Sequence, residues 1–472
     1  MAKRKLSFRD FGLTTDPFPG VNGRLTFQGS KLKGPLGFQF YNADAQLLGK
    51  SLGQHLPFAG ALWHFRNPLG DIFSDMGTAI RPWDDGTASF ENAERCLRVF
   101  FYMLHILGIP YWCWHDFDLV PRGRSLEEFH GNIDKMLPVI KELGDLTGIK
   151  VGWTTQNLFS QPRYTEGAAT SPDVDVFAQA WAQTKKMLDV NQWFQQNDLG
   201  ANNHVFWGGR EGYRQLLSTQ LEQESDQIAT FFWTAVRYCE KIGLKVQFLI
   251  EPKPKEPSVH QYDHSVEVAI AFLRKYGLQD HFKFNVETNH AQLAGLTVEH
   301  ECTVAASQGL LGGVDVNEGT FGVGWDTDRF LGDPLIALEI MLPVLKYQGD
   351  IGTGVYNFDA KCDRGSFDPL DLIYAHLLGM ETMALGTALA AALIDNGTLE
   401  TAVKRRYQNW EGPLGQGILA GLNDPSKIDF DQLAAHGMKQ GWALTPAMSA
   451  HHELNRLTVI RTLPTALKLL EG

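Results

Sequence analysis

Acidic residues and histidines recur in this 472-residue chain at the ends of short β-rich runs. If those ends meet at one edge of the fold, the carboxylates would repel one another unless a cation lies among them. Carboxylate oxygens with an occasional imidazole suit Mg²⁺, Mn²⁺ or Co²⁺ better than a metal that prefers thiolates. Two ions that share Glu287 would account economically for the whole set of candidate ligands: Glu251, Glu287, His290, Asp315, Asp326, Asp328 and Asp359.

Each of these residues alone also has an ordinary structural explanation. A single Asp at a strand end is more often a helix N-cap than a ligand. The pair Asp326 and Asp328 could form an Asx-turn, and the segment from Glu287 to His290 could simply begin a helix. These explanations become strained when they must all hold at once, so the sequence favours a divalent-metal site.

The segment EPKPKEP at residues 251–257 is the sharpest local signal. Its prolines keep the chain extended or turned, and in an extended chain Glu251 and Lys253 point to the same side. A carboxylate for a metal and an ammonium for a substrate oxygen would then share one pocket. For Lys253 a solvated, proline-stiffened loop is an equally good explanation, and for Lys255 it is the better one.

Aromatic residues close to the same strand ends could form the walls of that pocket. Flat apolar walls suit the CH faces of a sugar and exclude water from a metal site. Each residue alone is more often part of a core. The candidates are Trp63, Trp114, Phe159, Trp207 and Tyr213.

The elements that must position these residues alternate between β-rich runs and helical patterns. Helices are expected at residues 90–107, 125–146, 174–190, 219–242 and 265–276. Such alternation is typical of parallel βαβ units, and eight runs favour an α/β fold of the closed (β/α)8 TIM barrel type. An open doubly wound sheet also alternates, but no GxGxxG follows the first run. The eight expected strands are 36–41, 111–115, 151–155, 205–208, 246–251, 282–287, 313–316 and 354–359.

The alternation stops near residue 385. We expect a catalytic barrel with an N-terminal lead-in at residues 1–385, and a helical C-terminal arm at 386–472 that packs on the barrel or on a neighbouring subunit. Within the arm, helices are expected at 384–394 and 457–470, with a glycine-rich connection at 412–421. The polar segment 192–203 is expected to be a surface loop.

Composition narrows the class of protein. The net charge of −12 argues against non-specific binding to nucleic acid. Five scattered cysteines without a CxxC pair suggest reduced thiols and a cytoplasmic protein. The N-terminus lacks the apolar region of a secretory signal. No apolar stretch of the roughly 18 residues that a membrane helix needs is evident.

With these features in view, the chain resembles the class II xylose isomerases. The similar segments follow one another in order across residues 36–385, and together they are highly specific. They are WHDFD (114–118), NLFSQPRYTEGAATSPDVDVFA (157–178), HVFWGGREGY (204–213), EPKPKEPSVHQYD (251–263), FNVETNHAQLAG (284–295), GWDTDRF (324–330) and NFDAK (357–361).

The resemblance implies a homotetramer that interconverts D-xylose and D-xylulose, and by extension D-glucose and D-fructose, through ring opening and a metal-assisted 1,2-hydride shift without nicotinamide. It also implies two divalent cations per subunit. Glu251, Glu287, Asp315 and Asp359 would hold the first, and Glu287, His290, Asp326 and Asp328 the second. His115, oriented by Asp118, would help to open the ring, and Lys253 would hold the oxygen on carbon one. Glu256–Pro257 would be a cis peptide. The sugar would be lined by Trp63, Thr155, Phe159, Val205 and Trp207.

The chain also departs from the family pattern, although at none of the expected metal ligands. The usual Asp-Pro-Phe-Gly is Asn67-Pro68-Leu69-Gly70 here, with Phe73 nearby, and the family's Phe enters a neighbour's active site. Leu296 replaces a His behind the metals, Thr320 an Asp, and Phe117 a common Arg. These changes could lower activity, alter metal preference or shift the substrate.

Two other functions compete with an isomerase. A metal-dependent barrel hydrolase of phosphodiesters would be expected to have more histidines and a basic groove, whereas this chain is acidic. A sugar-binding relative without turnover would not be expected to keep every candidate ligand together with Lys253 and His115.

Overall fold

The computed structural model describes residues 5–66, 81–362, 368–442 and 452–471. Contacts divide the chain into two compact units. The first comprises Met1–Thr387 with Leu470–Gly472, and the second is Ala388–Leu469.

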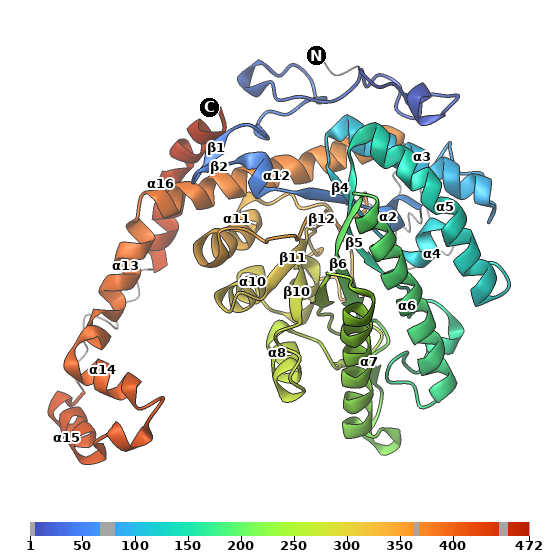
Figure 1. Cartoon of the computed structure of the whole chain (residues 1–472). Helices are drawn as coiled ribbons and strands as arrows, with labels where there is room; N and C mark the ends of the chain where they lie inside the picture. The colour runs from blue at the N-terminus through green and yellow to red at the C-terminus, as the bar shows by residue number, and fades with distance from the viewer. Residues whose placement is uncertain (1–4, 67–80, 363–367, 443–451, 472) are drawn as a thin grey trace. The chain divides into compact units, whose positions relative to one another are not determined.

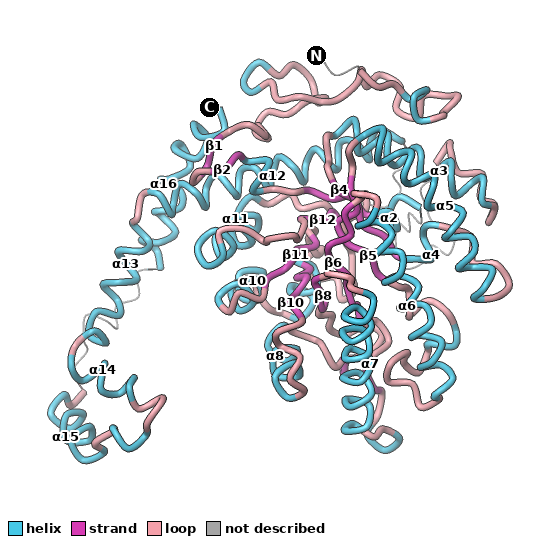
Figure 2. The backbone as a smooth tube through the Cα atoms, in the orientation of Figure 1, coloured by secondary structure: helices cyan, strands magenta, loops and turns pink. Residues whose placement is uncertain are grey.

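The first unit contains a closed barrel of eight parallel strands, surrounded by helices (Figures 1 and 2). Around the barrel the order is β10-β11-β12-β3-β4-β5-β6-β8, so consecutive strands lie side by side and β3 closes the sheet against β12. The predicted (β/α)8 architecture is confirmed. The strands are β3 (Phe58–Ala61), β4 (Tyr111–His115), β5 (Lys150–Thr155), β6 (Gly200–Trp207), β8 (Gln247–Glu251), β10 (Phe282–Glu287), β11 (Leu311–Asp315) and β12 (Tyr356–Phe358).

Helices follow the strands and begin and end at conventional signals. In α3 the hydroxyl of Ser89 accepts a hydrogen bond from the Asn92 amide, and Gly108 ends the helix with a left-handed conformation. The five helices expected between strands are all present within a few residues of their expected bounds, except that α6 runs on to Gln196. The main helices are α2 (Leu62–Arg66), α3 (Phe90–Leu107), α4 (Asp116–Leu119), α5 (Leu126–Thr147), α6 (Val174–Gln196), α7 (Leu221–Ile242), α8 (Val266–Lys275), α9 (Thr288–Ala294), α10 (Val298–Ser307), α11 (Pro334–Pro343) and α12 (Pro369–Asp395).

The expected first strand at residues 36–41 is wrong. That segment is irregular, and its backbone amides at Gln39, Phe40 and Tyr41 donate to the carboxylate of Glu381 on α12. The true first strand is β3, with the sequence FAGA. A side chain at Gly60 would lie 2.6 Å from Leu104, so close packing against α3 requires small residues here, and these carry little β propensity.

The expected surface loop at residues 192–203 is also wrong, because α6 continues to Gln196 and β6 begins at Gly200. Phe194 is fully buried. The polar residues satisfy backbone groups instead of solvent, since the Gln195 amide donates to the carbonyls of Ala201 and Lys245. The polar composition of residues 192–203 therefore reflects the end of α6, which packs closely on β6.

The barrel interior is filled by apolar side chains, so the polar site lies above a packed floor. Cys96, Cys113, Cys239 and Cys302 are buried free thiols. Helix α12 is long and apolar enough to span a membrane by length and composition, contrary to expectation, but 78% of its apolar window is buried in the protein, as in a core helix. The interior cluster comprises Ala59, Cys113, Trp153, Val205, Leu249 and Val355.

The second unit is helical. The expected glycine-rich connection at 412–421 is mostly the helix α14, and the helices expected at 384–394 and 457–470 lie within α12 and α16. Many large apolar side chains of this unit are exposed, including those of Leu422, Phe430 and Trp442. Its other helices are α13 (Thr398–Tyr407), α14 (Pro413–Ala420), α15 (Phe430–Gln440) and α16 (His452–Glu471).

Candidate metal centre

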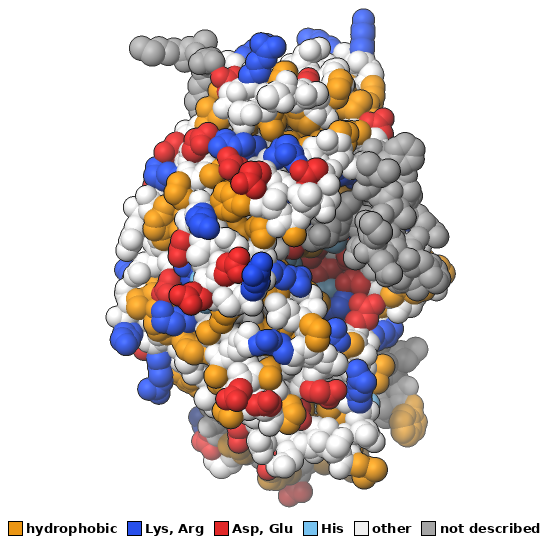
Figure 3. Space-filling view, turned by 90° about the vertical axis from the view of Figure 1, so that its right-hand side faces the viewer, with side chains coloured by type: hydrophobic (Ala, Val, Ile, Leu, Met, Phe, Trp, Pro, Cys, Tyr) orange, Lys and Arg blue, Asp and Glu red, His pale blue; other side chains and the backbone are white. Residues whose placement is uncertain are grey.

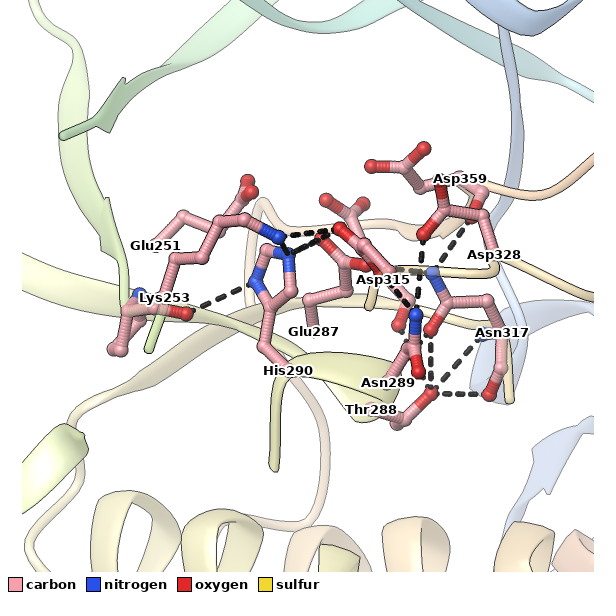
Figure 4. Close-up of polar contacts among 12 residues, drawn as sticks. Glu251, Lys253, Glu287, Thr288, Asn289, His290, Asp315, Asn317, Asp328 and Asp359 are labelled. Atoms are coloured by element: carbon pink, nitrogen blue, oxygen red, sulfur yellow. Dashed lines mark hydrogen bonds and ion pairs between the residues drawn. The ribbon is translucent and has the colours of Figure 1, made fainter. Parts of the chain in front are cut away.

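The barrel brings every expected metal ligand to the carboxyl ends of its strands (Figure 4). One group, in which ligand atoms lie within 4.8 Å of one another, consists of Glu251, Glu287, Asp315 and Asp359. A second group consists of Glu287, Asp326 and Asp328, and Glu287 belongs to both. Figure 3 shows Asp, Glu and His side chains gathered in a hollow on one face.

His290 joins the second group from α9, three residues after Glu287. Its Nδ1 lies 3.0 Å from the carbonyl oxygen of Pro252, which can only accept a hydrogen bond. The proton is thereby placed on Nδ1. Nε2 lies 2.9 Å from Glu287 and 3.1 Å from Asp326, where it would offer its lone pair to a cation bound among these groups.

Asparagines on neighbouring strands hold two of the carboxylates, Glu251 and Asp315, in place. The Asn285 amide donates to Glu251 and Asp315, at 3.0 Å and 2.7 Å, and the Asn357 amide donates to Asp315 at 2.8 Å. The sequence reading missed them. The signal was present, because Asn285 and Asn357 stand two residues before Glu287 and Asp359 and hence on the same side of their strands.

The electrostatics of the cluster favour a bound cation. Burial raises the pKa of Glu251 to about 8, and burial together with neighbouring carboxylates raises the pKa values of Glu287, Asp315 and Asp328 well above their usual range. A cation among these groups would offset their mutual repulsion and favour the ionised carboxylates. Oxygen ligands with one imidazole fit Mg²⁺, Mn²⁺ or Co²⁺.

Lys253 lies against the second group. Its Nζ is 2.5 Å from Asp326 and 3.1 Å from Glu256, and only 3% of the side chain is exposed. Burial alone would lower the pKa of Lys253, but the facing carboxylates of Asp326, Glu287 and Glu256 outweigh it and raise the pKa. The ammonium therefore stays charged. The Glu256–Pro257 peptide is cis, as expected.

His115 ends β4 and faces an aromatic pocket. Its Nδ1 lies 2.9 Å from Asp118. Burial disfavours the imidazolium, but the bond to Asp118 outweighs this and raises the pKa of His115. The His115 ring meets the Trp63 ring edge-on, with ring centroids 4.7 Å apart, and the Phe159 ring with centroids 5.6 Å apart.

The expected sugar-lining residues do not all have the same environment. Phe159 and Trp207 pack edge-on with centroids 4.3 Å apart, and the indole of Trp63 donates to Asp359 at 2.8 Å. Thr155 is buried and donates to the carbonyl of Val205. Val205 itself is fully buried in the apolar interior cluster.

His64 and Lys361 also reach the cluster and were not expected there. His64 Nε2 lies 2.5 Å from Asp359 and 3.7 Å from Asp328, and Lys361 Nζ lies 3.3 Å from Asp328. His64 lies on α2, directly after β3, and was missed because β3 was not recognised. Lys361 stands two residues after Asp359 in NFDAK and could have been found by that spacing.

Three departures from the family pattern, Phe117, Leu296 and Thr320, lie within the described residues. The guanidinium of Arg122 sits over the Phe117 ring, 4.3 Å from its centroid, so this Phe is the base of a cation–π contact. Leu296 follows the end of α9, and the Thr320 amide donates to Thr327 within the loop that carries Asp326. Asn67, Leu69 and Phe73 lie outside the described residues.

Three related proteins found by comparison of sequences carry the same name. No family model matches the chain. It is 46% identical to the xylose isomerase of Rhodopirellula baltica, over 88% of this chain and 92% of that protein. It is 44% identical to the xylose isomerase of Shouchella clausii, over 90% and 94% of the two chains, and 45% identical to that of Arabidopsis thaliana, over 89% and 85%. The chain belongs to the xylose isomerase family.

Proposed function

We propose that the protein interconverts D-xylose and D-xylulose, and also D-glucose and D-fructose, with two divalent cations per subunit, Mg²⁺, Mn²⁺ or Co²⁺. The observation that carries this proposal is the pair of ligand groups that share Glu287, beside Lys253 and His115. The first cation would be held by Glu251, Glu287, Asp315 and Asp359, and the second by Glu287, His290, Asp326 and Asp328.

Ring opening requires a proton to move between the sugar's ring oxygen and the hydroxyl on carbon one. His115 is suited to this, because Asp118 binds Nδ1 and leaves Nε2 for the sugar. The raised pKa of His115 means that the imidazole can hold the proton during the transfer.

Isomerisation then moves hydrogen between carbons one and two. Divalent cations at these sites would polarise both oxygens, so no nicotinamide is needed. Lys253 donates a hydrogen bond to the oxygen on carbon one and stabilises negative charge there. The rings of Trp63, Phe159 and Trp207 exclude water, which favours direct hydrogen transfer over proton exchange with solvent. Thr155 and Val205 complete the pocket from strands β5 and β6.

The same proposal covers assembly and location. The exposed apolar side chains of the second unit suit an arm that binds neighbouring subunits in a homotetramer. The net charge of −12 disfavours nucleic acid as a partner, and the free cysteines suit the cytoplasm.

The test is a direct assay of the metal-stripped protein. It is incubated with D-xylose alone and with Mg²⁺, Mn²⁺ or Co²⁺, and D-xylulose is followed by NMR. We expect ketose only when a cation is added. Absence of ketose with every cation would refute the proposal. D-Glucose and D-ribose in parallel samples show whether Phe117 and the other departures have shifted the substrate.

A further inference from the structure

Asp116 is a buried carboxylate with no part in the reaction proposed above. It follows His115 directly, at the start of α4, and is 1% exposed. Its Oδ1 accepts hydrogen bonds of 2.8 Å from the backbone amides of Phe117 and Asn157, and its Oδ2 accepts one of 2.9 Å from the amide group of Gln183. All three partners donate, so the position requires an acceptor.

The bond to Asn157 reaches the turn after β5. The side-chain oxygen of Asn157 accepts from the amides of Phe159 and Ser160, at 3.3 Å and 2.9 Å. Arg210 Nε donates to the Phe159 carbonyl at 3.0 Å. The turn at residues 157–160 is thus tied from both sides, and it carries the Phe159 ring that faces His115 and Trp207.

We propose that Asp116 is a positioning residue, which fixes the turn at 157–160 and so holds Phe159 against His115 as the sugar-facing wall. The consequence for sugar binding rests on the proposed isomerase function, whereas the order of the turn does not. Asp116 acts through Asn157 and does not touch the sugar itself.

The hydrogen bonds of Gln183 explain why position 116 needs a carboxylate. Tyr164 donates its hydroxyl hydrogen to the side-chain oxygen of Gln183, which turns the Gln183 NH₂ group toward Asp116. An Asn at position 116 would set one NH₂ group against another. The double variant Asp116→Asn with Gln183→Glu removes this conflict. One oxygen of Glu at position 183 can accept from Tyr164, and the other can accept from the NH₂ group of Asn at position 116.

The experiment compares the full-length D116N, Q183E, D116N/Q183E and N157A variants. Amide hydrogen exchange reports the order of residues 157–160, and steady-state kinetics with D-xylose and Mg²⁺ separate KM from kcat. For D116N and N157A we expect exchange in this turn to accelerate and KM to rise by about tenfold, with a smaller change in kcat. The double variant should regain both the protection and the KM of the wild type.

Glu381→Gln is the matched control, because Glu381 also accepts three backbone amides but anchors residues 39–41. It should alter thermal stability and leave KM unchanged. Wild-type exchange and KM in D116N and N157A would overturn the proposal, as would a double variant that recovers stability but not KM. If the wild type does not convert D-xylose, the isomerase function fails and hydrogen exchange alone decides the role of Asp116.

Discussion

Lys253 is the only group at the site whose predicted role depends on a positive charge within reach of the substrate. Replacing it in Lys253→Ala removes the ammonium and its buried stem, while the barrel strands on either side are unchanged. We expect turnover of D-xylose to fall by about a thousandfold, as for loss of a donor to a developing oxyanion, with the fold intact by circular dichroism.

Lys255→Ala is the matched control, since Lys255 is exposed two residues farther along the same loop. Its turnover should equal that of the wild type. Near-normal activity of Lys253→Ala would refute the assigned role of the ammonium.

Glu287 belongs to both ligand groups, whereas Asp315 belongs to one. Glu287→Gln should therefore weaken both metal sites, and Asp315→Asn should weaken only the first. We expect each affected site to lose more than about a hundredfold in affinity, because losing a direct ligand exceeds the usual effect of losing an outer partner. Calorimetric titration of the metal-free protein with Co²⁺ would show this, and a normal second binding step in Glu287→Gln would argue against a shared ligand.

The positions of the candidate ligands could be predicted from the sequence because an acidic residue at the end of a strand marks its own place in the barrel. Each of Glu251, Glu287, Asp315 and Asp359 ends or directly follows a β-rich run, and a closed parallel barrel brings such ends together. Contacts between residues that follow different strands, such as His64 after β3 with Asp359 after β12, depend on the register of those strands and could not be obtained from one sequence.

At the scale of a single element, strand β6 carries a buried histidine that must stay neutral. His204 is fully buried between Thr154, 3.0 Å from Nδ1, and Gln156, 2.8 Å from Nε2, and burial lowers its pKa from 6.5 to about 3. Because the unfolded chain binds the proton more readily, the neutral imidazole stabilises the fold fully above pH 6.5. This contribution is lost as the pH falls toward 3.

His204→Gln tests this, since the amide keeps polar contacts but does not titrate. When the pH is lowered from 7.5 to 5, the free energy of unfolding of the wild type should fall by about 2 kcal/mol relative to that of His204→Gln. Urea unfolding at both pH values measures it. His436→Gln, at an exposed position of α15, is the control for replacing a histidine away from this buried site. A constant difference across this range would mean that His204 takes up its proton equally in the folded and unfolded chain, which contradicts the prediction.

Helices and strands could be predicted from the sequence where the local residue pattern agrees with the packing that the fold requires. Helix α3 has both a Ser89 cap and a Gly108 end, and its bounds matched the pattern. Strand β3 could not be recognised, because Gly60 fits closely against α3 and Ala59 packs in the barrel interior, and small residues carry little β propensity. The prediction of a surface loop at residues 192–203 was also wrong because of tertiary packing. A polar side chain there binds backbone far away in the sequence, as Gln195 does with the Lys245 carbonyl.

At the scale of the whole molecule, the second unit is difficult to explain as part of a monomer. Leu422, Phe430 and Trp442 are large apolar residues that stand exposed on it, and exposed apolar surface of this kind is typical of an interface. We therefore expect a homotetramer, with a mass by light scattering four times the 52.7 kDa of one chain.

A double substitution, Leu422→Glu with Phe430→Glu, places charge in the interface and should give smaller species at the same concentration. Lys439→Gln on α15 is the control and should leave the mass unchanged. A monomeric wild type would show that these side chains serve some purpose other than assembly.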